Sequence, residues 1–326
     1  MVRHTYGTPD ILALENVDPP TVGEDGVLIR VRAASVNPFD WHSLSGKPFL
    51  VRLAFGVPRP RRTTLGVDVA GTVEAVGRDV TQFRPGDEVF GVAPGSLAEY
   101  ACARENSIVA KPKQVTFEQA AAVPIAGLTA LQALRDTGKL QAGQRVLING
   151  AAGGVGTFAV QIAKALGAEV TGVCSTANVE RVRSIGADHV VDYTRDDFAR
   201  SGRRYDVLLD NVGNRSLSDC RRVLHPRGVY VMVGGPKTGP LLGIMFRMLG
   251  AMVVFRAAGR KAAPAMARRN KSDLQTLSDL LAEGKITPVI DRTYPLTDTR
   301  DAFRHLGRGH ARGKIVITTW SGGGSG

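Results

Sequence analysis

The chain has 326 residues, of which 43% are hydrophobic and 22% charged, so it is long enough for two folded domains and too apolar for a disordered protein. Its net charge is +12, from 42 basic and 30 acidic residues. The arginines occur in short scattered groups, without a long basic run or interleaved aromatic residues, so the charge favours a solvated surface over a nucleic-acid interface.

The first third of the chain is predicted to form strands and turns. Short β-branched runs at 27–31 and 71–76 are bounded by turn residues, and 84–89 is expected to be a turn that leads into another strand. From residue 117 onward, helix-like and strand-like segments alternate, which predicts a parallel sheet with helices on both faces. The expected strands are 145–149, 169–174, 189–191, 206–210 and 229–233, and the expected helices are 120–134, 155–166, 177–185 and 215–224.

The last part of the chain is less regular. A helix is expected at 273–283 and a strand at 314–318, and the composition of 321–326 is that of a flexible tail. The apolar stretch 240–258 contains Arg247 and Arg256, which disfavours a membrane-spanning helix. We therefore expect no membrane partner, and a subunit interface or a substrate pocket over this stretch.

The three cysteines, Cys102, Cys174 and Cys220, lie far apart in the sequence. Their number and spacing argue against a disulfide framework or a structural zinc cluster, and they fit a reducing cytosol. The first fourteen residues lack a basic region followed by an apolar run. We therefore expect no secretory signal and a cytoplasmic protein.

The strongest motif is a glycine-rich turn at 150–156, between an apolar strand and a helix. Gly153 and Gly156 would let the backbone approach a pyrophosphate and let the helix pack closely on the strand, and the N-terminus of the helix offers free N–H groups. Ala151 replaces the first glycine of G-x-G-x-x-G, but the flanking strand and helix and the second strand at 169–174 support the motif. The sequence thus predicts a dinucleotide site, with a merely tight turn as the alternative.

The end of the second strand indicates which dinucleotide is bound. NAD sites usually place a carboxylate there, whereas this strand is followed by Ser175 and Thr176, with no carboxylate before Glu180. The two hydroxyl groups are suited to donate to a 2′-phosphate, with Arg181 as a cationic partner. We therefore expect NADPH, although Ser175 and Thr176 are also suited to cap the following helix.

Further motifs, spread over nearly the whole chain, resemble the motifs of one family. The resemblance is to the medium-chain dehydrogenase/reductase superfamily, and within it to the zinc-independent quinone oxidoreductase and enone reductase branch. The segments that carry it are 33–40, 65–71, 84–89, 127–130, 150–156, 166–168, 185–188 and 309–314.

The resemblance implies an α/β protein of two domains. A GroES-like β-rich catalytic domain would comprise 1–120 and 258–320, and a Rossmann domain with a doubly wound parallel sheet would comprise 121–257. It also implies a homodimer formed through edge strands of the Rossmann sheets, and the segment 250–255 is similar to that edge strand.

The chain departs from the zinc-dependent relatives of this superfamily. Those relatives have Cys at the position of Asn37 and Gly-His-Glu where this chain has Gly-Val-Asp at 66–68. The segment 124–127, where a third ligand is expected, contains no Cys or His. Catalytic zinc needs about three protein ligands, and Asp40 and His42 are only two scattered donors, so we expect no metal site.

The resemblance also implies individual site residues. Asn37 would lie near the nicotinamide ribose or the substrate oxygen, and Asp40 and His42 would face the substrate. His42 is a candidate proton donor because histidine titrates near neutrality; a solvent-facing turn residue, with solvent as the proton source, is the alternative. Lys314 would lie near the cofactor or simply at a strand edge. The expected cofactor contacts are Asn37, Thr129, Gly153, Gly154, Val155, Gly156, Ser175, Thr176, Arg181, Tyr193, Asn211, Val212, Gly234, Gly235 and Lys314.

Without zinc to polarise an alcohol oxygen, the expected hydride acceptor is electron-poor. In a quinone or in the C=C bond of an α,β-unsaturated carbonyl, hydride adds to carbon and the charge moves to a distant oxygen that hydrogen-bond donors stabilise. One alternative is a zinc-independent reductase of another carbonyl substrate. Another is a non-catalytic NADPH-binding protein that binds RNA or a protein partner, which only the +12 charge supports.

Overall fold

The computed structural model describes residues 1–235, 241–309 and 311–319, and of 241–246 and 248 it describes the backbone only. The chain divides into two compact units. Unit 1 comprises Met1–Ala126, Arg269–Gly284 and Pro288–Gly326, and unit 2 comprises Gly127–Arg268 and Lys285–Thr287. The tail expected at 321–326 lies outside the described residues.

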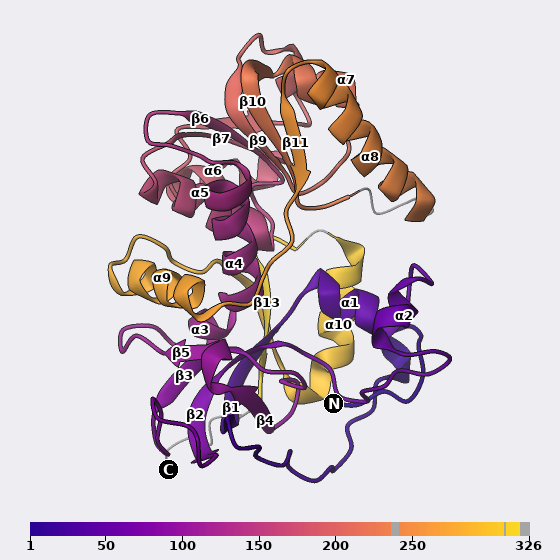
Figure 1. Cartoon of the computed structure of the whole chain (residues 1–326), viewed down its shortest axis with the longest axis vertical. Coiled ribbons are helices and arrows are strands. Elements are labelled where there is room, and N and C mark those ends of the chain that lie inside the picture. The colour runs from indigo at the N-terminus through magenta and orange to yellow at the C-terminus, as the bar shows by residue number, and fades with distance from the viewer. Residues whose placement is uncertain (236–240, 310, 320–326) are drawn as a thin grey trace. The chain divides into compact units, whose positions relative to one another are not determined.

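Unit 1 is built on a seven-stranded sheet with the order β12-β13-β1-β2-β3-β5, in which β4 also pairs with β1 (Figure 1). Its longest strand, β1, buries Val27, Ile29 and Val31 at alternating positions, as a strand with one face on a core must. The strands are β1 (Gly26–Val36), β2 (Asp68–Val76), β3 (Glu88–Val92), β4 (Tyr100–Arg104), β5 (Ile108–Ala110), β12 (Ile290–Pro295) and β13 (Lys314–Thr318).

The helices of unit 1 are short, and they flank this sheet. They are α1 (Pro38–Ser45), α2 (Val51–Phe55), α3 (Phe117–Ala121), α9 (Lys271–Ala282) and α10 (Thr299–Arg308). One further helix, α4 (Pro124–Gln132), begins in unit 1 and continues into the sequence of unit 2.

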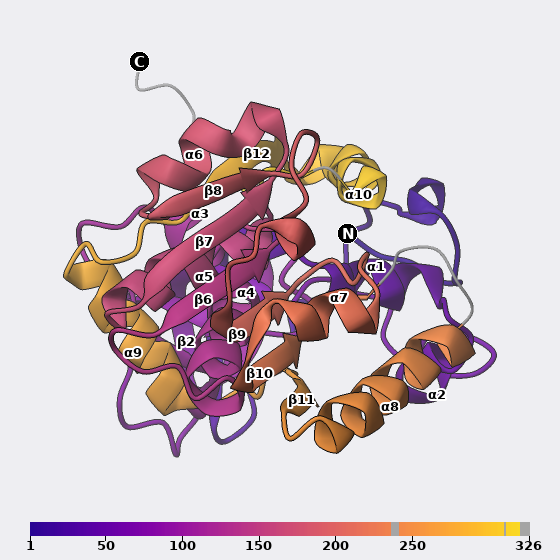
Figure 2. The same ribbon diagram turned by 90° about the horizontal axis from the view of Figure 1, so that it is seen from above.

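Unit 2 contains a six-stranded parallel sheet with the order β8-β7-β6-β9-β10-β11, which Figure 2 shows from above. Counted along the chain this is 3-2-1-4-5-6, the order of a dinucleotide-binding doubly wound sheet. The strands are β6 (Arg145–Asn149), β7 (Glu169–Cys174), β8 (His189–Asp192), β9 (Tyr205–Asp210), β10 (Leu224–Met232) and β11 (Lys261–Pro264). The connecting helices are α5 (Gly154–Ala165), α6 (Val179–Ser184), α7 (Leu217–Arg222) and α8 (Leu241–Ala257).

The expected α/β class, with a GroES-like β-rich domain and a Rossmann-type parallel sheet, is confirmed. One expectation is wrong: residues 250–255 lie in α8, and the edge strand of the sheet is β11. A long apolar run without alternation does not distinguish a strand from a helix, and here the run is long enough for a helix. Strand β11, which the sequence analysis placed with the catalytic domain, pairs with β10 inside unit 2.

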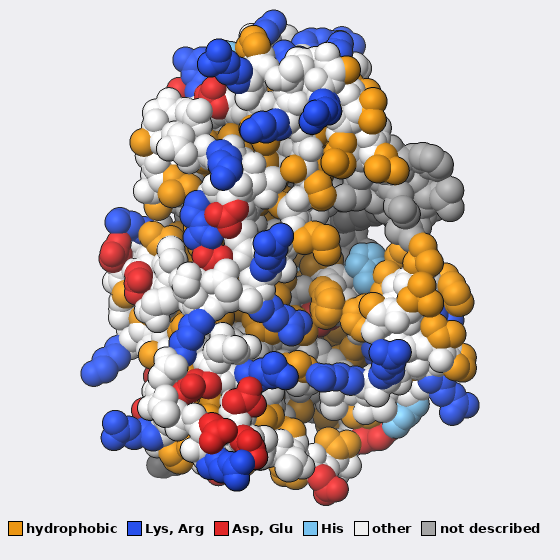
Figure 3. Space-filling view, in the orientation of Figure 1, with side chains coloured by type: hydrophobic (Ala, Val, Ile, Leu, Met, Phe, Trp, Pro, Cys, Tyr) orange, Lys and Arg blue, Asp and Glu red, His pale blue; other side chains and the backbone are white. Residues whose placement is uncertain are grey.

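The distribution of basic side chains agrees with the expectation that the positive charge belongs to a solvated surface. On the face shown in Figure 3, Lys and Arg side chains are spread over the surface instead of gathered in one patch. Among the described residues, no helix is both long enough and apolar enough to cross a bilayer.

Candidate functional site

The glycine-rich turn of unit 2 lies at the carboxyl end of β6. Gly150 has a φ of +81° and turns the chain from β6 into the loop, and Gly153 is the N-cap of α5. The N–H groups of Gly150 and Ala151 donate to the carbonyl of Val173 in β7, at 3.2 and 3.0 Å. The turn is therefore held between two neighbouring strands, and the first N–H groups of α5, which have no partner within the helix, lie at this edge of the sheet.

Gly153 and Gly156 have different roles in this turn. A Cβ atom on Gly156 would lie 2.1 Å from the carbonyl oxygen of Gly150, so only glycine lets α5 pack this closely on the turn. A Cβ atom on Gly153 would meet nothing closer than 3.6 Å. The fold therefore requires glycine at Gly156. Beside Gly153 it leaves space, which would allow a pyrophosphate to lie close to the backbone.

Asp210, at the end of β9, holds the neighbouring loops in place. Its carboxylate is buried and accepts from the amide of Asn149 at 2.8 Å, from the N–H groups of Val212 and Gly213 at 3.1 and 2.9 Å, and from the hydroxyl of Tyr230 at 2.8 Å. This carboxylate thus links the ends of β6, β9 and β10. From the sequence, Asp210 is expected only as the last residue of a strand, although an acidic residue directly after an apolar run marks the position.

The segment after β7, where the adenosine ribose is expected, contains a carboxylate from the next strand. The Thr176 hydroxyl donates to Asp192 at 2.6 Å, so its proton is already engaged. Asp192 ends β8, and hydrogen bonds from Thr176 foremost lower the pKa of its carboxyl group. Ser175 accepts from the amide of Asn178 at 2.9 Å, which leaves the serine proton for a donor bond. Of the two expected phosphate donors, only Ser175 therefore has an unengaged proton in the described structure.

The other expected cofactor residues of unit 2 are distributed over the same edge of the sheet. Asn211 and Val212 follow β9, Gly234 and Gly235 follow β10, and Tyr193 follows β8 with 52% of its surface exposed. Among the described residues, the buried Oδ1 atoms of Asn178 and Asn211 have no hydrogen-bond partner. Two buried acceptors at this edge suit a ligand that carries hydroxyl or amino donors, as a dinucleotide does. The other expected contacts are Arg181, which is half-buried in α6, and Thr129, which is half-buried in α4.

Two of the expected residues of unit 1, Asn37 and Lys314, meet at a buried carboxylate that is not among the residues expected from the sequence. Asp68, the first residue of β2, has no exposed surface. Its Oδ2 accepts from the Ser35 hydroxyl at 2.7 Å, the Asn37 amide at 2.8 Å and the Lys314 ammonium at 3.3 Å. Its Oδ1 accepts from the N–H of Ile125, in the first turn of α4, at 3.0 Å. We call these five residues the Asp68 cluster.

Asn37 and Lys314 bind each other within this cluster. The ammonium group of Lys314 donates to Oδ1 of Asn37 at 2.6 Å, and the lysine is only 3% exposed. Lys314 begins β13, which lies between β12 and β1, so it is not at the edge of the sheet. Since the Asn37 amide already donates to Asp68, one of its two N–H bonds is committed inside the protein.

Asp40 and His42 lie in α1, and their environments differ. Asp40 is buried and accepts from the N–H of Asn37 at 2.8 Å, at the start of the helix. Burial, and then the charge of Asp68, raises the pKa of Asp40 to about 7. His42 is exposed, and its Nδ1 lies 2.8 Å from the carbonyl of Lys47. A carbonyl only accepts, so the proton of the neutral ring is on Nδ1, and only a protonated His42 has a proton to give from Nε2.

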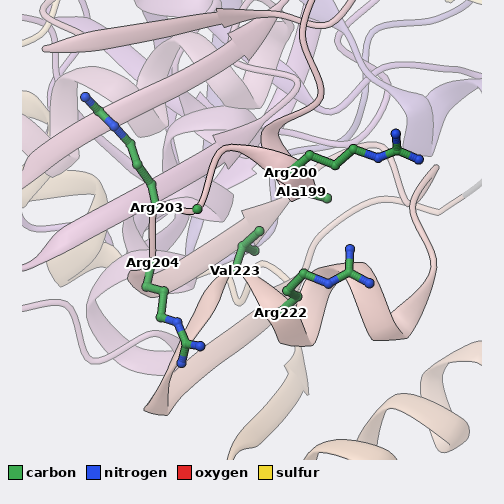
Figure 4. Close-up of a pocket in the computed structure, with 7 residues that line it drawn as sticks. Ala199, Arg200, Arg203, Arg204, Arg222 and Val223 are labelled. Atoms are coloured by element: carbon green, nitrogen blue, oxygen red, sulfur yellow. The ribbon is translucent and has the colours of Figure 1, made fainter.

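A hollow of about 250 Å3 lies at the amino ends of β9 and β10, opposite the ends at which the cofactor residues lie. Figure 4 shows that the side chains of Arg203 and Arg204 extend in opposite directions, and that those of Arg200 and Arg222 extend away from both. These guanidinium groups do not converge on one anion, so the hollow is not a prepared binding site. A second hollow, of about 380 Å3, lies in unit 1 against Asp291 and His305. Across the described ranges, no group of three His, Cys, Asp or Glu side chains is arranged to hold a metal ion.

Comparison with known proteins identifies the family. A family model described as an alcohol dehydrogenase GroES-like domain matches residues 23–113, and one described as a zinc-binding dehydrogenase matches residues 185–317. The Mus musculus protein named NAD(P)H oxidoreductase RTN4IP1, mitochondrial, is 37% identical, over 96% of this chain and 87% of the mouse chain. The Arabidopsis thaliana protein named NADPH-dependent alkenal/one oxidoreductase, chloroplastic, is 34% identical, over 97% of this chain and 78% of the plant chain.

A solved structure agrees with these relatives. The quinone oxidoreductase from Coxiella burnetii superposes with a TM-score of 0.86 at 31% identity, and the match covers 98% of both chains. The chain therefore belongs to the medium-chain dehydrogenase/reductase superfamily, in its quinone and enone oxidoreductase branch. It is an oxidoreductase that uses a nicotinamide cofactor.

The two glycines of the turn provide a matched pair of variants. Gly153→Ala is expected to keep the melting temperature of the parent and to weaken NADPH binding at least tenfold, because the new methyl group makes only an ordinary contact in the protein, 3.6 Å from the Gly150 carbonyl oxygen, but obstructs the pyrophosphate. Gly156→Ala is expected to lose about 1–3 kcal/mol of stability, because its methyl group overlaps the Gly150 carbonyl. Thermal unfolding and NADPH titration measure both. Unchanged NADPH affinity in Gly153→Ala would show that the turn does not hold the pyrophosphate.

The buried ion pair of unit 1 can be tested by a double-mutant cycle. Asp68→Ala leaves the buried Lys314 ammonium without a counter-charge, and we expect a loss of about 3–5 kcal/mol in urea unfolding at pH 7. Combining Asp68→Ala with Lys314→Met removes the orphaned charge and should recover part of that loss. If the double variant is at least as unstable as Asp68→Ala alone, the pairing is not what stabilises this region.

Proposed function

We propose that the protein is an NADPH-dependent, zinc-independent oxidoreductase that transfers hydride to a quinone or to the C=C bond of an α,β-unsaturated carbonyl. The observation that carries the proposal is the turn at 150–156, which follows β6 of a sheet with dinucleotide-binding order and leaves space beside Gly153. The names of the relatives, an alkenal/one oxidoreductase and a quinone oxidoreductase, support this acceptor class. The bound cofactor would supply the hydride from its nicotinamide ring.

The donor set supports zinc independence, although one matching family model is described as a zinc-binding dehydrogenase. Asn37 stands where zinc-dependent relatives have Cys, and its amide already binds Asp68 and Lys314. Val67 is buried and has no donor atom, and 124–127 contains no Cys or His. The chemistry therefore relies on an acceptor that is already electron-poor, whose developing charge hydrogen-bond donors stabilise.

We assign different tasks to the two units. In unit 2, the N–H groups at the start of α5 hold the pyrophosphate, and Asp210 fixes the loops after β6, β9 and β10 against which the cofactor lies. In unit 1, Lys314 and Asp68 hold the Asn37 amide in one orientation, so that its second N–H is available for the nicotinamide ribose or the substrate oxygen. The acceptor takes its final proton from solvent or from protonated His42.

We assign NADPH as the cofactor because Ser175 has an unengaged hydroxyl proton and no Asp or Glu directly follows β7. The name of the plant relative, which specifies NADPH, supports this choice. Asp192 works against it, since its carboxylate lies beside Thr176 and repels a nearby phosphate. We infer that the affinity for NADPH is lower than the site would otherwise reach.

The cofactor assignment predicts a preference that one substitution strengthens. We expect a higher kcat/KM with NADPH than with NADH, and Asp192→Asn should raise that ratio by about 3- to 10-fold because it removes a negative charge beside Thr176. Asp196→Asn is the matched control, because it makes the same change of charge at an exposed position four residues later. A parent enzyme that prefers NADH would contradict the assignment.

The acceptor class is tested by product analysis. A simple quinone and an α,β-unsaturated ketone are expected to oxidise NADPH, and the matched saturated ketone is not; a metal chelator should leave the rates unchanged. The unsaturated ketone should return saturated at C=C with its carbonyl intact. An alcohol product would indicate reduction of the carbonyl group instead, and no turnover together with salt-sensitive RNA binding would indicate the non-catalytic alternative.

We further propose that the protein is a homodimer in a reducing compartment. In unit 2, β11 is the edge strand of the parallel sheet, and exposed strand edges pair readily with a second copy. The three cysteines are free thiols, which supports the cytoplasm expected from the sequence. The names of the mouse and plant relatives place those two proteins in mitochondria and chloroplasts.

A further inference from the structure

A continuous segment of unit 1, from α1 to the start of β2, exposes large apolar side chains. Phe49 and Leu53 are each 63% exposed, Val57 is 55% exposed, Leu50 52% and Phe39 43%. In Figure 3 a group of hydrophobic side chains lies over the position that α2 has in Figure 1. We call these five side chains the α2 surface.

The α2 surface is presented by a folded segment. The rings of Phe39 and Phe55 pack edge to face with their centroids 5.3 Å apart, which joins α1 to α2. Tyr6 donates from its hydroxyl to the carbonyl of Gly56 at 2.7 Å, and Arg52 donates to the carbonyl of Gly46 at 3.2 Å. The hydrogen bond from Tyr6 ties the segment to the rest of unit 1, the other two contacts lie within the segment, and its apolar side chains remain exposed.

The charged side chains of the segment that carries this surface have one sign. No Asp or Glu occurs between Asp40 and Asp68, whereas the same stretch contains five basic residues: Lys47, Arg52, Arg59, Arg61 and Arg62. The last three and Lys47 are exposed, and none of these four forms an ion pair with the residues that the structure describes. In the chain as a whole, by contrast, 42 basic residues are accompanied by 30 acidic ones.

We propose that the α2 surface attaches the protein to the surface of an anionic phospholipid bilayer. Exposed Phe and Leu side chains insert at the boundary between headgroups and acyl chains, while nearby Lys and Arg bind the anionic headgroups. This proposal departs from the expectation of no membrane partner, which rested on the unsuitability of 240–258 as a membrane-spanning helix, whereas attachment at the bilayer surface requires no such helix. A second copy of this chain fits the surface poorly, because it would bring five cationic side chains against five more.

Vesicle flotation tests the proposal on the full chain, without cofactor or acceptor, so the outcome does not depend on the proposed reaction. We expect binding to vesicles that contain phosphatidylglycerol in phosphatidylcholine, weaker binding to pure phosphatidylcholine, and release by high salt. A double variant with Phe49→Ser and Leu53→Ser should weaken binding at least tenfold. A triple variant, in which Arg59, Arg61 and Arg62 are each changed to Gln, should also weaken binding at least tenfold. Circular dichroism and a melting curve check that each variant is folded.

The matched control is Leu249→Ser with Val253→Ser, which removes two comparably exposed apolar side chains from α8 in unit 2. This control should bind the anionic vesicles as the parent does. If the parent protein does not bind anionic vesicles, the proposal is wrong. The α2 surface would then be assigned to a protein partner that has acidic residues around its contact surface. An equal loss in the α8 control, or parental binding that folded α2-surface variants retain, would also overturn it.

Discussion

The carboxylate of Asp68 is the constraint on which the arrangement of unit 1 depends. It accepts hydrogen bonds from the end of β1, from the start of β13 and from the first turn of α4, although these segments lie far apart in the sequence. Removing this carboxylate and the Lys314 ammonium from water is costly, and their attraction offsets the cost only when the remaining bonds are satisfied. Ser35, Asn37 and Ile125 satisfy them, so the ion pair fixes one geometry for the Asn37 amide.

Unit 2 uses a buried carboxylate in a similar way. Asp210 accepts from side chains and backbone N–H groups at the ends of three strands, so the loops that would hold a cofactor are set by one residue at the sheet edge. In both units a buried acid organises a place where a ligand is expected, and neither carboxylate has to contact that ligand. Such supporting residues determine how well a site is held before anything binds.

The sequence was most informative where a local pattern decides the structure. The strands at 145–149, 169–174 and 314–318 occur within the expected bounds, because each is a short apolar run closed by turn residues. The helix α8 was not predictable in this way, because a long apolar run lacks a period that separates a helix from a strand. The Asp68 cluster could not be assembled from the sequence, since its members come from five separate positions, although an acidic residue in the apolar run at 65–71 marked one of them.

The pairing of β7 with β8 also changes the charge near the expected adenosine ribose. No acidic residue directly follows β7, yet the parallel pairing of β7 with β8 brings Asp192 against Thr176. A motif read along one strand contains no information about its neighbour in the sheet. The charge near the expected adenosine ribose therefore depends on the order of the strands in the sheet as much as on the residues that follow β7.

The burial of Asp40 couples folding to the uptake of a proton by this one carboxyl group. Its carboxyl group has an ordinary pKa of 3.8 and is raised to about 7 in the folded protein. Between these values the folded protein holds a proton that the unfolded chain has released, so the contribution of Asp40 to stability falls as the pH rises through this window and is constant above it. Refolding at pH 5.5 in weak buffer should therefore take up a proton through Asp40. With that proton in place, the charge of Asp68 is balanced by that of Lys314 alone.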